Sequence, residues 1–185
     1  MALTVAYCAE TCDVELGGRY ADALRWLPAM RPYELRAELS KSDFFDTAYA
    51  VTHIVYTLND FGRFLLSPSW LPNEFEFLHD NLESAMVLHD PDLTGELLDT
   101  YRAFGVSDDD SKVMRAYDFL IESQNPDGSW GEWDWETVYS AFHATWAAMD
   151  GLREFSWKGP RLANPRLMKM LQEMVHDRDG ERILK

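Results

Sequence analysis

Two segments of the chain repeat one pattern of side chains that could carry chemistry. The shared pattern reads acid–Thr–x–Tyr–x–x–x–His–x–x–aromatic. Its chemically active positions are Asp46, Tyr49 and His53 in the first copy and Glu136, Tyr139 and His143 in the second. In each copy the acid precedes the histidine by seven residues. Seven residues turn a helix by about 700°, so the two side chains share one face.

The repeated histidines predict a metal centre if their helices face one cavity. Counting nine residues back from Gly62 and from Gly105 reaches His53 and Glu96, which places these two at the same level of neighbouring helices. We therefore expect His53, His143 and Glu96 to meet. Two imidazoles and one carboxylate form a ligand set for non-haem iron and also suit zinc.

The remaining residues of the repeat have several candidate roles. Asp46 and Glu136 would be further ligands, hydrogen-bond partners that hold the imidazoles, or acid–base groups. Tyr49 and Tyr139 would orient a substrate. Two other interpretations stay open: the residues line a polar cavity without metal, or they make only structural hydrogen bonds and helix caps.

The elements that must position these side chains read as helices separated by turn residues, which predicts an all-α fold. The expected helices cover 18–40, 44–58, 73–88, 94–104, 112–123, 135–149 and 165–176. The more apolar ones lie around 44–60, 94–104 and 135–150, and more charged helices alternate with them. This alternation predicts an inner and an outer layer of stacked helical hairpins.

Residues 115–130 resemble the QW repeat of squalene-hopene and oxidosqualene cyclases. The motif is carried by Arg115, Gln124, Gly128 and Trp130 at the expected offsets. Gln124 can bond loop backbone groups, Gly128 permits a tight turn, and Trp130 offers a large apolar face. The resemblance implies an α/α-toroid of the squalene-cyclase and prenyltransferase type.

The resemblance extends over about 93–150, and the internal repeat adds 43–62. Residues 1–42 match poorly, and the whole chain 1–185 is predicted to be a single α/α-toroid-like domain. It contains fewer helices than a full toroid requires. A partial toroid, a ring completed by a homo-oligomer and a divergent fragment all remain open.

The catalytic motifs of the resembling families do not transfer to this chain. Proton-initiated cyclases carry Asp-x-Asp-Asp-Thr-Ala, and the nearest segment here, 43–48, has Phe45 where the acid should stand. Prenyltransferases of this fold bind zinc through Asp, Cys and His, but Cys8 and Cys12 lie far from the repeated histidines in sequence.

Composition narrows the class of protein. Hydrophobic residues make up 46% of the chain, which is enough for a packed core. The net charge of −15 opposes binding to nucleic acid and to anionic membranes. The sequence has no apolar run long enough for a transmembrane helix and no basic leader, so a cytoplasmic location is expected.

Two functions from different classes account for these features. The first is an enzyme with a metal or polar centre in an aromatic-lined helical cavity. It would act on a small or apolar metabolite, as in secondary metabolism, with iron or zinc as its cofactor. The second is a non-catalytic toroid-like module that binds a small molecule or assembles with a partner.

Overall fold

The computed structural model describes residues 2–33, 41–132, 138–155 and 157–176, and the regular elements in these ranges are helices. They are α1 (Ala2–Thr11), α2 (Tyr20–Leu24), α3 (Leu27–Met30), α4 (Lys41–Asn59), α5 (Pro72–Val87), α6 (Pro91–Arg102), α7 (Ser111–Glu122), α8 (Val138–Leu152), the 3₁₀ turn η1 (Pro165–Leu167) and α9 (Met168–His176). The all-α prediction is confirmed. None of the described helices combines the length and apolarity that crossing a bilayer requires.

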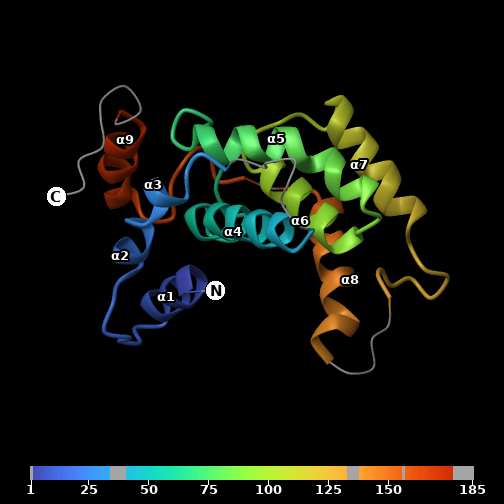
Figure 1. Cartoon of the computed structure of the whole chain (residues 1–185), viewed down its shortest axis with the longest axis horizontal. Helices are drawn as coiled ribbons and strands as arrows, with labels where there is room; N and C mark the ends of the chain where they lie inside the picture. Colours follow the sequence, from blue (N-terminus) through green and yellow to red (C-terminus); the bar gives the residue numbers. More distant parts are fainter. Residues whose placement is uncertain (1, 34–40, 133–137, 156, 177–185) are drawn as a thin grey trace.

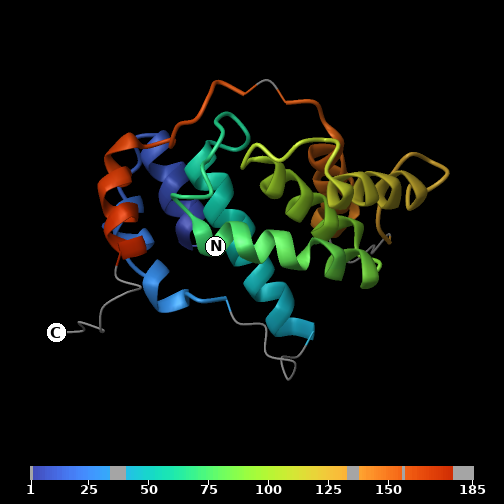
Figure 2. The same cartoon turned by 90° about the horizontal axis from the view of Figure 1, so that it is seen from above.

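Helix α6 lies at the centre and packs against α4, α5, α7 and α8 (Figures 1 and 2). Every residue from Leu93 to Arg102 is buried. The helix cap lies four residues earlier than the sequence predicted, at Asp90 and not at Thr94. The Leu93 amide donates to Asp90 Oδ1 at 2.9 Å, and Pro91 occupies the first turn.

Helices α6 and α8 cross in direct backbone contact at two glycines. A β-carbon on Gly95 would lie 2.4 Å from the Ala147 carbonyl oxygen. One on Gly151 would lie 3.0 Å from the Gly95 carbonyl oxygen. The absence of side chains at both positions therefore lets the backbones meet. This crossing holds His143, about two turns before Gly151, over the first half of α6.

The loop after α7 makes the contacts that its sequence motif predicted. Gln124 Nε2 donates to the Gly128 carbonyl at 2.9 Å, and Gly128 has a φ of +89°. Trp130 is buried in the core, where its Nε1 donates to the Leu120 carbonyl at 2.6 Å. These bonds tie the end of α7 to the segment that leads to α8.

Replacing Trp130 by phenylalanine is expected to lower the free energy of unfolding by about 2 kcal/mol, because it removes one hydrogen bond and leaves part of the buried ring volume empty. The loss is limited because the Ser123 hydroxyl still donates to the Leu120 carbonyl, at 3.1 Å. Urea unfolding measures the difference. Trp26→Phe is the matched control, since Trp26 is 71% exposed. Equal stability of both variants and the wild type would contradict a structural role for the indole N–H.

The single helix expected over 18–40 is wrong for the part of it that the structure describes. The chain forms the short helices α2 and α3 instead, and Pro28 lies in the first turn of α3, where its missing N–H is tolerated. The segment after α3 is tied to α5 by Arg31, which donates to both oxygens of Glu74 at 2.8 and 2.6 Å. The N-terminal segment therefore packs through a buried ion pair as well as apolar contacts.

Candidate metal centre

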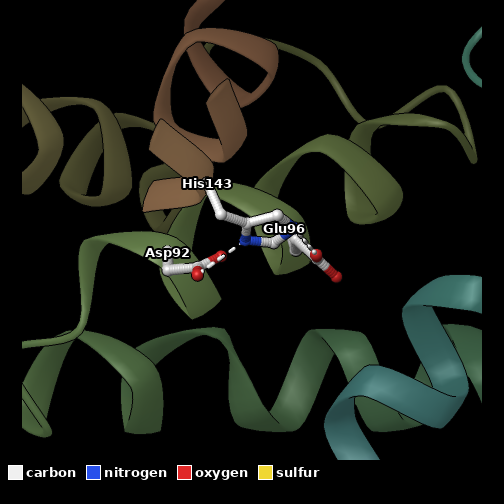
Figure 3. A group of neighbouring side chains, drawn as sticks. All are labelled: Asp92, Glu96 and His143. Carbon is white, nitrogen blue, oxygen red and sulfur yellow. Dashed lines mark hydrogen bonds and ion pairs between the residues drawn. The ribbon is translucent and has the colours of Figure 1, made fainter. Parts of the chain in front are cut away.

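A cluster of two carboxylates and one imidazole lies where α8 crosses α6. Asp92 and Glu96 are four residues apart on α6 and share one face of it. His143 reaches down from α8 between them (Figure 3). Its Nδ1 lies 2.7 Å from Asp92 Oδ2, and its Nε2 lies 3.7 Å from Glu96 Oε1. We call Asp92, Glu96 and His143 the carboxylate–imidazole cluster.

The cluster offers the types of ligand atom that a metal ion accepts, close to one another. One ligand atom from each of the three residues can be chosen so that all lie within 4.8 Å of one another. The side chains are largely shielded from solvent: 23% of Asp92, 6% of Glu96 and 17% of His143 is exposed. The Thr52 hydroxyl on α4 donates to Glu96 Oε2 at 2.6 Å and orients that carboxylate from behind.

The charges of the cluster are incompletely balanced. Burial raises the pKa of Glu96 to about 7. The hydrogen bond to Asp92 raises the pKa of His143, so the imidazole holds its proton more tightly than usual. The ionised form of Glu96 is therefore poorly compensated by its surroundings, and Asp92 Oδ1 is buried with no hydrogen-bond partner among the described residues. An additional cation would stabilise both groups.

One turn further along α6, a third buried carboxylate has its own cation. Asp99 lies 3.4 Å from the guanidinium of Arg153, which also lies 3.4 Å from Asp150. Burial nevertheless raises the pKa of Asp99 to about 7. This face of α6 therefore concentrates acids, and among the described residues an arginine or lysine pairs with Asp99 but with neither Asp92 nor Glu96.

The structure brings together two of the three metal ligands that the sequence predicted. Glu96 and His143 belong to the cluster, whereas His53 does not. The Nδ1 of His53 lies 2.6 Å from the carbonyl of Tyr49 on the same helix. Burial lowers the pKa of His53, and the nearby His143 acts in the same direction. A neutral His53 with Nδ1–H donated to its own helix is therefore the form that these contacts favour.

Asp92 is the cluster residue that the sequence reasoning missed. The signal for it was its position four residues before Glu96, in the first turn of a helix that begins at Pro91. A carboxylate at this position reads equally well as a partner of the helix dipole. Only the direction of α8 makes it a neighbour of His143.

The other predicted residues of the repeat occupy different environments. The ring of Tyr139 stacks on His143, with ring centroids 4.4 Å apart. Tyr49 is half-buried on α4, and burial together with the charge of Asp92 raises its pKa. Asp46 is exposed on α4. The prediction for Glu136 falls on 133–137, outside the described residues.

The fold and this cluster define an all-helical protein with a candidate metal centre at the crossing of two helices. A family model described as a domain of unknown function (DUF6895) matches residues 15–143. Because this match covers more than half of the chain, the protein belongs to that family. The matched stretch includes every residue of the carboxylate–imidazole cluster. No curated protein and no solved structure matches the chain.

Proposed function

We propose that the protein is a metal-dependent enzyme whose divalent ion is held by Asp92, Glu96 and His143. The observation that carries the proposal is that one ligand atom from each residue lies within 4.8 Å of the others. Two ligands of one ion at bond lengths near 2.1 Å lie at most about 4.2 Å apart. Binding one ion therefore requires the side chains to move, because Asp92 faces Nδ1 of His143 and Glu96 faces Nε2, and an ion binds only one of these nitrogens.

The donor set supports iron or zinc. Two carboxylate oxygens and one imidazole nitrogen are ligands that both ions accept. Three protein ligands leave at least one coordination position open, as in catalytic and unlike structural zinc sites. A bound ion would supply Lewis-acid chemistry. The hydroxyl groups of Tyr49 and Tyr139 stay protonated because burial raises both pKa values, so they can donate hydrogen bonds to a substrate.

We further propose that the scaffold is a partial α/α-toroid and that the substrate is a small or apolar metabolite. The bond from Gln124 to Gly128 and the buried Trp130 support the toroid, since these are the contacts expected of the QW-like motif. Aromatic rings beside the cluster support the substrate class. Tyr139 and Trp146 both contact the His143 ring.

Metal titration tests the proposed centre. We expect wild-type protein, freed of metal and then titrated calorimetrically with Zn²⁺ or with Fe²⁺ under anaerobic conditions, to bind one ion. Asp92→Asn, Glu96→Gln and His143→Gln should each weaken binding by about 100-fold or more, because even residues behind the ligands are worth about 10- to 100-fold. His53→Gln should bind like the wild type, because His53 lies outside the cluster.

The pattern across the variants decides the outcome. Loss of binding in His53→Gln but not in His143→Gln would move the site to α4 and contradict the cluster. Failure of the wild type to bind either ion would remove the metal centre altogether. Circular dichroism of each metal-free variant separates loss of a ligand from loss of the fold.

A further inference from the structure

Helix α8 carries an apolar stripe that the described part of the chain leaves uncovered. The stripe consists of Tyr139, Phe142, Trp146 and Met149, which are 59%, 45%, 58% and 59% exposed. Their spacing of three, four and three residues places them on one face of the helix. Figure 1 shows that the N-terminal half of α8, which carries Tyr139 and Phe142, projects away from the other helices.

The stripe is continuous with the carboxylate–imidazole cluster. The buried face of α8 consists of small residues, including Ala144, Ala147 and Ala148, and His143 lies at its edge. From His143 the rings follow one another outward. Its ring stacks on Tyr139 at 4.4 Å and meets the edge of Trp146 at 6.4 Å, and Trp146 stacks on Phe142 at 6.5 Å. An apolar path therefore leads from the centre along α8.

The size of the stripe suits a small ligand better than a second protein. A fully buried aromatic side chain covers about 150–250 Å². Four side chains that are about half exposed therefore offer on the order of 400 Å², half of the ~800 Å² that each partner contributes to a standard protein interface. From Tyr139 to Met149 the helix advances by ten residue steps, or about 15 Å at 1.5 Å per residue. This is the length of an extended medium-length alkyl chain or a small ring system.

We propose that the ligand of this protein is an amphiphile, with an oxygen head group that binds the metal and an apolar body that lies along the α8 stripe. This inference rests on the proposed metal centre. The head group completes the coordination that three protein ligands leave open. The apolar body covers the exposed rings of Phe142 and Trp146.

Alkyl hydroxamates of increasing length test the inference, because every member presents the same metal-binding oxygens. The dissociation constants of acetohydroxamate, hexanohydroxamate and octanohydroxamate are measured with the Zn²⁺-loaded full chain. A methylene fully removed from water strengthens binding about fourfold, and one covered on a single side about twofold. We expect octanohydroxamate to bind on the order of 50-fold more tightly than acetohydroxamate.

Serine substitutions locate the contact. Phe142→Ser with Met149→Ser, two stripe residues other than the pair that touches the His143 ring, should reduce the gain in affinity with chain length and leave acetohydroxamate binding unchanged. Met114→Ser with Ile121→Ser is the matched control, because these α7 residues are 53% and 62% exposed away from the cluster. This control variant should keep the wild-type increase in affinity with alkyl chain length.

Each other outcome overturns the inference in a recognisable way. Acetohydroxamate binding without any gain from a longer chain leaves the metal centre standing and removes the amphiphile. Absence of Zn²⁺ binding removes both proposals. Self-association of the wild type that Phe142→Ser with Met149→Ser abolishes would assign the stripe to a second copy of the chain.

Discussion

Gly95→Ala is expected to lower the free energy of unfolding by about 3 kcal/mol and to abolish metal binding. The new methyl group would stand 2.4 Å from the Ala147 carbonyl oxygen and 2.7 Å from the Ala148 nitrogen. These are backbone atoms of a packed helix and cannot rotate away, so α6 and α8 must separate. The strain outweighs the roughly 1 kcal/mol that alanine gains over glycine as a helix former. Thermal and urea unfolding measure the loss.

Gly18→Ala is the matched control for this substitution. A β-carbon at Gly18 meets no atom within 4 Å, and its φ is not in the left-handed region. We expect its stability to stay within about 0.5 kcal/mol of the wild type. Wild-type stability and Zn²⁺ affinity in Gly95→Ala would show that the two helices do not depend on this close crossing.

Metal-free protein is expected to lose stability as the pH rises from about 5 to 8. Glu96 and Asp99 have folded-state pKa values of about 7, above the ordinary values of 4.5 and 3.8. Folding therefore favours their protonated forms. Their contribution is complete at low pH and is lost as the pH rises through the folded-state pKa. These shifts correspond to about 3 kcal/mol for Glu96 and about 4 kcal/mol for Asp99. The raised pKa of His143 acts in the same direction.

Glu96→Gln is expected to stabilise the metal-free protein at high pH and to remove most of the stabilisation by Zn²⁺. An amide keeps the oxygen that accepts from Thr52 but carries no charge, so the metal-free variant should exceed the wild type by up to about 3 kcal/mol at pH 8 and match it near pH 4.5. Zn²⁺ should instead stabilise the wild type increasingly with pH, because its ligands must be ionised. The variant should gain little from the ion. Urea unfolding at several pH values, with and without Zn²⁺, measures both effects.

Glu76→Gln is the control for this charge removal, because Glu76 is an exposed carboxylate on α5. It should follow the wild type at every pH. A Glu96→Gln variant that is less stable than the wild type at pH 8 without metal would mean that the carboxylate is a favourable structural charge. The argument that the ionised Glu96 is poorly compensated without a bound cation would then be wrong.

Most helices could be predicted because their signals act over a few neighbouring residues. The helix expected over 112–123 is α7, and Asp110 caps it by accepting from the Lys112 and Val113 amides. The expected helix over 44–58 is the core of α4. The single helix expected over 18–40 was wrong because Pro28 lies in the first turn of a new short helix, α3. The Arg31–Glu74 ion pair then ties the following segment to α5, and no local sequence pattern predicts that contact.

The candidate site could be predicted only in part. The repeated pattern predicted His143, and the count of nine residues back from Gly105 predicted Glu96. Both predictions follow from residue spacing within one helix. Spacing could not predict that His53 would find a partner in the Tyr49 carbonyl of its own helix. Nor could it identify Asp92, whose neighbour lies on another helix, 51 residues away in sequence.

The amino-acid sequence by itself determined an all-helical chain, the ends of several helices and the faces on which the acids and imidazoles lie. These properties depend on capping, periodicity and turn residues, which are local. The tertiary structure alone decided which of the duplicated histidines meets two carboxylates and which apolar face stays open. Both depend on the angle at which α8 crosses α6, and the backbone contact at Gly95 and Gly151 sets that crossing through atoms that no local pattern describes.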